Sequence, residues 1–172
     1  MAVSWYVIRS KPNKEEFLAG QLSAYGIKVY YPRIRVKTVN PRARKVKAYF
    51  PSYLFVQVDL ETVSTSTLQW MPGAVNLVSF DGEPASVPDA LISAIDRQVE
   101  HINVSQENLV NGLKPGEAVV IHEGPFAGYE AIFDGRIPGR ERVRVLLTFL
   151  QKRHLPVELR ENQIGRAKGS GS

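Results

Sequence analysis

The stretch Tyr49–Asp59 reads Y-F-P-S-Y-L-F-V-Q-V-D and has the alternating pattern of a β-strand. Successive side chains of a strand point to opposite faces, and here one face is aliphatic and the other mainly aromatic: Leu54, Val56 and Val58 against Tyr53, Phe55 and Gln57. An ordinary antiparallel strand is apolar on one face only, so the aromatic face needs a cover, either from the protein or from a partner. Pro51 cannot donate to the ladder, so we expect a break that turns Phe50 out of the regular alternation.

The composition limits the class of protein. The chain has 172 residues, 44% of them hydrophobic, which predicts folding around a core as one domain of ordinary size or two small ones. No apolar run approaches the roughly 18 residues of a membrane span, and the N-terminus lacks a secretory signal pattern, so we expect a cytoplasmic protein that does not bind membranes. The absence of cysteine excludes disulfides, thiolate metal sites and cysteine redox chemistry.

The net charge is +5, and the cations concentrate in one segment. In the later half of the expected strand 28–37, cations alternate with Ile34 and Val36, and Asn40-Pro41 then marks a turn. This pattern predicts a long hairpin with a basic tip, which is either a solvated charged surface or a flap that touches phosphate. No acidic residue interrupts its cations, which are Arg33, Arg35, Lys37, Arg42, Arg44, Lys45 and Lys47.

Residues 1–102 predict the order β-α-β-β-α-β-α. The first helix follows Pro12 and ends at Gly26, the second is short and rich in hydroxyl groups, and the third begins at Pro88. This order is typical of an α+β sandwich in which helices pack on an antiparallel sheet. The polar residues 103–113 show no sustained period, which predicts a linker.

After the linker the pattern changes to short strands separated by turns. Residues 114–166 predict a small closed five-stranded barrel, with strands at residues 117–122, 129–133, 142–149, 156–160 and 163–166. Residues 142–147 alternate arginine with valine and leucine, and Pro156 would interrupt a helix, so strands are expected there. Residues 167–172 are expected to form a disordered tail.

The sequence lacks the groups that catalysis requires. The three histidines, His101, His122 and His154, do not have metal-ligand spacing, the carboxylates are scattered, and no glycine-rich phosphate loop follows a strand. We therefore expect a binding protein with two modules rather than an enzyme, and no cofactor or metal.

Several motifs together resemble one family. Residues 4–7 (S-W-Y-V), 49–56 (Y-F-P-S-Y-L-F-V), 71–75 (M-P-G-A-V) and 80–84 (F-D-G-E-P) are similar to the N-terminal (NGN) domain of NusG-type transcription elongation factors, and residues 115–128 resemble a KOW motif. The resemblance covers nearly the whole chain. It implies an NGN-like domain at residues 1–102 and an SH3-like KOW barrel at residues 114–166.

Within that family the chain is most similar to the specialised RfaH-type paralogues. The similarity lies in F-P-S-Y-L-F-V at 50–56, E-A-I-F at 130–133 and the hydroxyl-rich residues 64–67, and housekeeping NusG usually has glycine where Ser52 stands. Phe17, Gln21 and Pro72 depart from the RfaH pattern, so the recruitment sequence of RfaH is not expected to be read. The C-terminal domain of RfaH can fold as a helical hairpin that masks the N-terminal domain, but here we expect a barrel as the ground state.

The resemblance implies a monomer that binds RNA polymerase, bridges its DNA cleft and suppresses pausing. The residues matching the surface for the β′ clamp helices are Trp5, Tyr6, Phe50, Pro51, Tyr53, Phe55, Phe80 and Ile92. Those matching the contact with the β-subunit gate loop are Ser64, Thr65, Ser66 and Thr67. Lys11, Lys14 and the hairpin cations would lie near upstream or non-template DNA. In the KOW domain, Phe126 and Phe149 would contact a partner, either the ribosomal protein NusE or the termination factor Rho.

Two other functions remain open at this point. One is a housekeeping NusG that acts with Rho. The other is a ribosome-associated KOW protein that binds RNA without polymerase.

Overall fold

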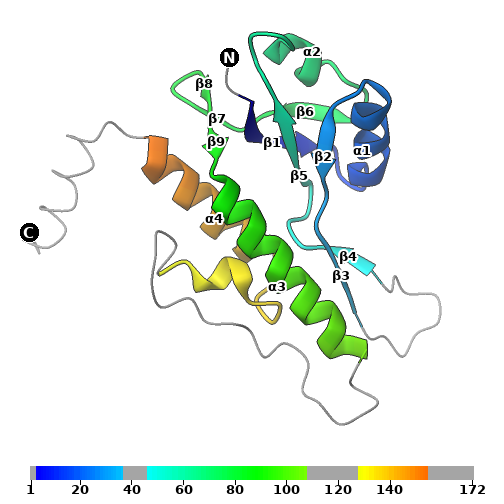
Figure 1. Ribbon diagram of the computed structural model, residues 1–172, viewed down its shortest axis with the longest axis vertical. Helices are drawn as coiled ribbons and strands as arrows, with labels where there is room; N and C mark the ends of the chain where they lie inside the picture. The colour runs from blue at the N-terminus through cyan, green and yellow to red at the C-terminus, as the bar shows by residue number, and fades with distance from the viewer. Residues whose placement is uncertain (1–2, 37–45, 108–127, 155–172) are drawn as a thin grey trace, which may run out of the picture.

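The computed structural model describes residues 3–36, 46–107 and 128–154. Residues 3–36 and 46–107 contain nine strands and three helices, and residues 128–154 add a 3-10 helix and a fourth α-helix (Figure 1). In chain order the elements are β1 (Ser4–Ser10), α1 (Glu15–Ala24), β2 (Lys28–Tyr30), β3 (Arg33–Arg35), β4 (Val46–Ala48), β5 (Tyr53–Val58), α2 (Thr65–Gln69), β6 (Ala74–Leu77), β7 (Ser79–Phe80), β8 (Glu83–Pro84), β9 (Ser86–Val87), α3 (Asp89–Glu107), η2 (Glu130–Phe133) and α4 (Gly139–His154).

The central sheet is antiparallel, with the strand order β2-β5-β1-β6 and with β9 also paired to β1. The register places Val7 opposite Phe55 and Ile8 opposite Leu54, so β1 and β5 present matching side chains on each face. One face carries Ile8 and Leu54 and packs against α1 and α2. The other face carries Val7 and Phe55 and packs against α3 and the C-terminal elements. The α+β sandwich predicted for the N-terminal part is therefore confirmed.

The basic segment forms a hairpin that is separate from the central sheet. Pro32 splits the expected strand at 28–37 into β2, which pairs with β5, and β3, which pairs with β4. Proline has no N–H to donate, so the ladder is broken there, while the Pro32 carbonyl accepts from Tyr49 N at 2.9 Å. The predicted hairpin is confirmed at its base, and its tip at residues 37–45 lies outside the described residues.

Helix α3 continues five residues beyond its predicted end, into the range expected to be a linker. It remains helical because it has tertiary contacts there: Ile102 is buried, and Asn103 binds the edge of β3. The Asn103 Oδ1 atom accepts from Arg35 N at 2.7 Å, and its Nδ2 atom donates to the Arg33 carbonyl at 3.4 Å. A single amide side chain thus supplies the two bonds that a neighbouring strand would make.

The prediction of a barrel is wrong for residues 128–154. The expected strand at 129–133 is the 3-10 helix η2, and the expected strand at 142–149 lies within α4. In a helix, Arg142, Leu146, Phe149 and Leu150 fall on one face, and all four are buried. The helical period therefore buries these side chains against the N-terminal part, which outweighs the weaker alternation of residues 142–147. The other three expected strands lie outside the described residues.

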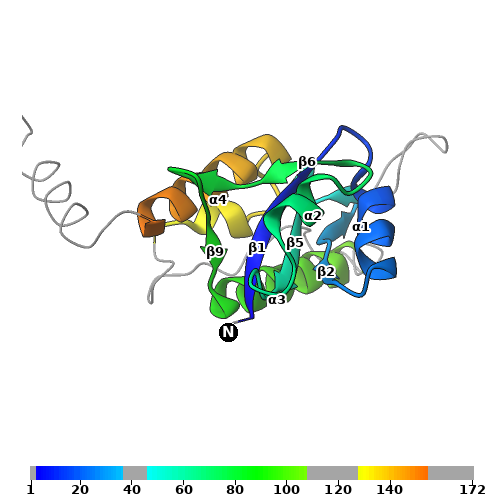
Figure 2. The ribbon, with the colours of Figure 1, turned by 90° about the horizontal axis from the view of Figure 1, so that it is seen from above.

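Helices α3 and α4 both lie on the side of the sheet away from α2, as Figures 1 and 2 show from two directions. Within the described part of the chain, no helix is long and apolar enough to cross a membrane.

Candidate protein-docking site

The aromatic face of the sheet forms the floor of the candidate site. Phe50 and Phe55 are fully buried, and their ring centroids lie 5.8 Å apart with an interplanar angle of 76°. Tyr49 meets Phe50 edge-on at 5.1 Å, so the three rings form a continuous series. Edge-to-face contacts of this kind are favourable because the positive edge of one ring meets the negative face of the next.

A tight turn before β5 directs Phe50 into this floor. Ser52 has a φ of 69°, in the left-handed region where a side chain costs about 1–2 kcal/mol relative to glycine. Two hydrogen bonds hold the turn: Ser52 N donates to Glu15 Oε2 at 3.0 Å, and the Ser52 carbonyl accepts from Ser10 N at 2.8 Å. The expected break in the alternation at Pro51 is present, and it turns Phe50 into the buried cluster between the sheet and the C-terminal elements.

The C-terminal elements cover the floor. Five of their side chains join the same buried cluster as Phe50 and Phe55, namely Ile132, Phe133, Leu146, Phe149 and Leu150. At the far end of α4, the ring of His154 lies 5.9 Å from that of Phe80, and its Nε2 atom lies 3.8 Å from Glu83 Oε2. The cover that the aromatic face of β5 requires is therefore supplied by the protein's own chain.

Arg142 ties the cover to the floor. Its side chain is only 3% exposed, and its Nε atom donates to the Tyr49 carbonyl at 2.9 Å. Its Nη1 atom donates to the carbonyls of Asp134, at 3.4 Å, and Ile137. The guanidinium carbon lies 4.1 Å from the centroid of the Tyr49 ring, a cation–π contact. This one residue thus joins α4, the loop that precedes it and the strand-turn region at Tyr49.

Burial dominates the electrostatics of this contact. Burial lowers the pKa of the Arg142 guanidinium, while nearby Tyr49 and Asp134 oppose that change. Burial also raises the pKa of the Tyr49 hydroxyl far above its usual range, although the Arg142 cation acts in the other direction. Among the described residues, none forms a hydrogen bond with Tyr49 Oη, which is buried. The packing of α4 on the sheet therefore keeps the Arg142 cation and the neutral Tyr49 phenol together out of water.

Two glycines allow the cover to approach closely. A Cβ atom at Gly139 would lie 2.7 Å from Pro51 Cδ, and one at Gly135 would lie 2.8 Å from Ile102 Cδ1. Real Cβ atoms do not come this close, so any side chain at either position would require a local displacement. The loop and the start of α4 are thus fitted to the turn at Pro51 and to α3.

The structure brings together seven of the eight residues predicted for the clamp-helix surface. Trp5, Phe50, Phe55 and Ile92 are buried in the cluster, Tyr53 and Phe80 are half-buried against it, and Pro51 faces Gly139. Tyr6 is the exception, because alternation along β1 places it against the aliphatic core on the opposite face.

The other predicted residues lie elsewhere or have structural roles. Ser64 is the N-cap of α2, where its Oγ atom accepts from Thr67 N at 3.1 Å, which explains part of the hydroxyl-rich run at 64–67. Phe149, predicted to contact a partner of the barrel, is instead buried in the cover. The described cations are exposed: Lys11, Lys14, Arg33, Arg35 and Lys47. Outside the described residues lie Lys37, Arg42, Arg44, Lys45 and Phe126.

The residues of the cover are not among those that the sequence patterns predicted for the site. Arg142 and Leu146 fall within the predicted strand at 142–149, Leu150 lies just beyond it, and Tyr49 is not among the predicted site residues. A signal was present in the spacing of Arg142, Leu146, Phe149 and Leu150, which is i, i+4, i+7 and i+8.

Comparisons with known proteins identify the family. The family model described as transcription termination factor NusG matches residues 3–96. The transcription termination/antitermination protein NusG of Escherichia coli K12 is 23% identical over 176 residues, covering 95% of this chain and 96% of that protein. The protein of the same description from Thermus thermophilus is 25% identical over 185 residues, covering 97% and 100%. A solved structure described as domain interaction in Thermotoga maritima NusG aligns with a TM-score of 0.42 at 24% identity, covering 74% of this chain and 76% of that chain. The chain belongs to the NusG family of transcription termination factors.

Proposed function

We propose that this protein is a transcription elongation and antitermination factor of the specialised, RfaH-like kind. In this proposal the aromatic floor binds the clamp helices of the RNA polymerase β′ subunit, and the C-terminal segment covers that floor until recruitment. The observation that carries the proposal is the burial of Phe50 and Phe55 beneath α4, with Arg142 bound to Tyr49. A surface used for docking must be exposed at some stage, so the cover has to leave.

The chemistry of the contact supports a cover that can detach. The Arg142 guanidinium donates across the contact to a main-chain carbonyl, that of Tyr49, and the His154–Glu83 pair lies at the exposed end of α4. Water can replace both interactions when the segment leaves. A hydrogen bond to a charged group contributes about 1.5–3 kcal/mol. Contacts with a polymerase surface can supply more free energy than that, so polymerase can displace the cover. The equilibrium would then shift toward the open form when polymerase binds that form more tightly.

Further contacts complete the proposed bridge. Helix α2 presents Ser66 at the surface and would contact the β-subunit gate loop, while Lys11, Lys14 and the basic hairpin would lie near exposed DNA. Holding β′ and β together across the cleft would favour the active conformer of the polymerase and suppress pausing. Once released, the C-terminal segment would be free to bind NusE.

The test is to compare polymerase binding and pausing across full-length variants. Arg142→Ala should strengthen binding to the cognate polymerase, because it weakens the cover but leaves the floor intact. Adding Tyr53→Ala, which truncates a half-buried residue of the floor, should remove that gain. Tyr25→Ala truncates an exposed aromatic at the C-cap of α1 and is the matched control, expected to have no effect. If Arg142→Ala binds polymerase no better than the wild type, the masking part of the proposal is wrong.

A housekeeping NusG that acts with Rho is the second candidate, and it is favoured by the names of the relatives, which include termination. A termination assay with and without Rho separates the two. A specialised paralogue should oppose Rho or leave it unaffected, whereas a housekeeping factor should increase Rho-dependent termination.

A further inference from the structure

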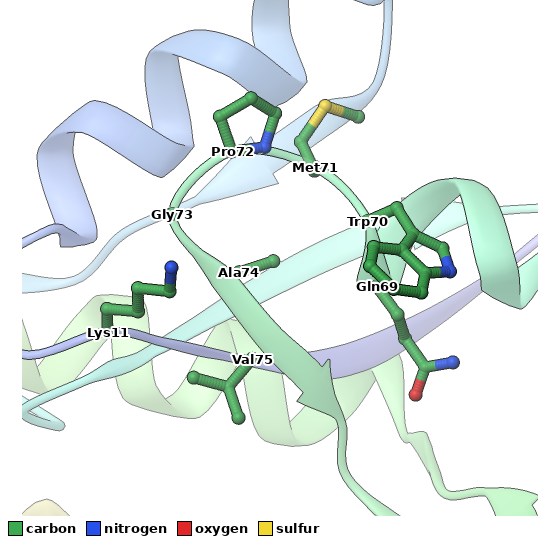
Figure 3. A pocket seen from close by; sticks show the side chains of 8 residues that line it. All are labelled: Lys11, Gln69, Trp70, Met71, Pro72, Gly73, Ala74 and Val75. Carbon is green, nitrogen blue, oxygen red and sulfur yellow. The ribbon is translucent and has the colours of Figure 1, made fainter.

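Two hollows of similar volume differ in which parts of the chain line them. The first, of about 460 Å³, lies beside the turn from α2 to β6, where Figure 3 shows Lys11 on one side of the start of β6 and Trp70 on the other. None of its lining residues belongs to the C-terminal cover. The second, of about 480 Å³, is lined by the base of the β3–β4 hairpin, by the turn at Pro51 and by residues 135–142. This hairpin cavity has walls from both sides of the contact, so it is complete only in the closed form.

A buried cation in the wall of the hairpin cavity has an unused donor. The Arg142 guanidinium lines the cavity, and its Nε and Nη1 atoms donate to main-chain carbonyls. Within the described residues, no acceptor is bonded to Nη2, and no carboxylate forms an ion pair with this guanidinium. A Cβ at Gly139, which also lines the cavity, would lie 3.6 Å from Nη2, so this nitrogen lies at the wall. Buried charges are ordinarily paired, and Nη2 is therefore the atom that remains to bind an anion.

The other charges of the lining also favour an anion. Lys47 and Arg140 are exposed, and neither forms an ion pair with a described residue. Arg136 lines the cavity too, although it has an ion pair of its own. Among the described lining residues, Glu15 is the one carboxylate, and its Oε2 atom already accepts from Ser52 N at 3.0 Å. Four cations thus face one carboxylate, which gives charge complementarity to an anionic ligand.

The remainder of the wall is aliphatic. Ile34, Val36 and Val46 come from the hairpin, while Pro51 and Ile137 come from the turn and from the loop before α4. No described lining residue has an aromatic ring, so a nucleotide base would find nothing to stack on. An apolar wall with a few convergent polar groups is the usual form of a small-ligand site, and the volume is within the range of such sites. The lining therefore fits a small anion with an aliphatic body.

We propose that the hairpin cavity binds a small aliphatic carboxylate, which accepts from Arg142 Nη2 while its alkyl chain packs on Val46 and Ile137. Since the walls come from both sides of the contact, this ligand binds the closed form and not the open one. At about 100 times its dissociation constant, the ligand would raise the ratio of closed to open form about 100-fold. It would thereby oppose docking on the aromatic floor, a consequence that rests on the proposed function.

The binding test uses the full-length protein and three probes. Octanoate has both the charge and the alkyl chain, octanamide has the chain without the charge, and acetate has the charge without the chain. Calorimetry should show octanoate binding at least about 10-fold more tightly than either of the others, because each of them lacks one half of the interaction. The proposal is overturned if octanoate does not bind, or if octanamide or acetate binds as tightly as octanoate.

Matched variants locate the bound octanoate. Val46→Glu places a like charge beside the proposed carboxylate and should weaken binding by about 10-fold or more. Val104→Glu makes the same change at a similarly exposed valine of α3, outside the lining, and should bind as the wild type does.

A second pair of variants keeps the test independent of the hairpin. Arg140→Gln should weaken octanoate binding by about 1.5- to 5-fold, the range for an exposed ion pair. Arg144→Gln removes the same charge one turn further along α4, outside the lining, and should have no effect. Octanoate binding that is unchanged in both Val46→Glu and Arg140→Gln would place the ligand elsewhere and overturn the proposal.

Hydrogen exchange separates this site from the docking function. Octanoate at about 100 times its dissociation constant should slow exchange of α4 about 100-fold, because α4 exchanges when the cover opens. Unchanged exchange in α4 overturns the proposal, whatever the effect on polymerase binding. If octanoate slows exchange in α4 but leaves polymerase binding unchanged, the hairpin cavity is supported and docking on the aromatic floor is wrong.

Discussion

The two faces of the central sheet are covered in different ways. The aliphatic face, which carries Ile8 and Leu54, is covered by α1 and α2, which follow or precede its strands closely in the chain. The aromatic face, which carries Phe50 and Phe55, is covered in part by α4, and the Arg142–Tyr49 bond joins residues 93 positions apart. A cover from distant residues has a larger closure entropy and fewer local contacts to retain it. We propose on this basis that the first face is a permanent core, and that the cover of the second face is exchanged for a partner.

The largest effect should come from matched truncations on the two faces. Leu54→Ala, in the permanent core, should lower the free energy of unfolding by about 2–5 kcal/mol, the cost of deleting a fully buried leucine side chain. Leu146→Ala removes the same atoms from the cover and should destabilise only α4. Urea unfolding followed by circular dichroism measures the first, and hydrogen exchange resolved along the chain measures the second. Equal losses of exchange protection throughout both variants would contradict the comparison.

Arg142→Ala should have the next largest effect, confined to the cover. Removing the guanidinium leaves the Tyr49 carbonyl buried without its donor, which should destabilise the closed form by about 1.5–3 kcal/mol. Hydrogen exchange of α4 should accelerate accordingly, while the sheet keeps its protection. Arg142→Lys is the control for charge, and it should recover only part of the loss because an ammonium lacks the planar fork. Full recovery by lysine would show that charge alone holds the cover.

Gly139→Val should open the closed form by overpacking. The new Cβ would meet Pro51 at 2.7 Å, and forced repacking of this kind costs about 1–3 kcal/mol. The matched control is Gly20→Ala in α1, where a Cβ meets nothing within 4 Å and helix propensity should add about 0.5–1 kcal/mol of stability. Thermal unfolding of the two variants should shift in opposite directions. If Gly139→Val leaves the hydrogen-exchange protection of α4 unchanged, the turn at Pro51 can move aside at little cost in free energy, which contradicts the expectation.

Tyr49→Phe should have the smallest effect in neutral solution and a distinct one in alkali. The buried hydroxyl has no hydrogen-bond partner among the described residues, so its removal should stabilise the closed form by up to about 1 kcal/mol. Burial raises the pKa of Tyr49, so the closed form binds its proton more tightly than the open form. Stability is then unaffected below pH 10.0, the ordinary pKa, and is lost as the pH rises beyond it. Stability of the closed form, measured from pH 8 to 11, should fall less in Tyr49→Phe than in the wild type.

Local patterns predicted the N-terminal part well because each element there is specified by nearby residues. The alternation from Tyr53 to Val58 correctly predicted that the side chains of β5 are divided between two buried clusters. The helix predicted after Pro12 is α1. Local patterns failed where a distant contact decides the outcome. Pro32 divides one expected strand between two sheets, and residues 103–107 remain helical because Asn103 binds β3.

By itself, the sequence determined that the aromatic face of β5 needs a cover, because period-2 alternation places Tyr53 and Phe55 together whatever lies above them. It also determined the family, through motifs that span both halves of the chain. Only the tertiary structure decided what the cover is. Residues 142–150 carry both a strand-like and a helix-like pattern, and the helix prevails because Leu146, Phe149 and Leu150 can all be buried on the aromatic floor at once. Neither pattern contains that information, since the floor is built from residues far away in the chain.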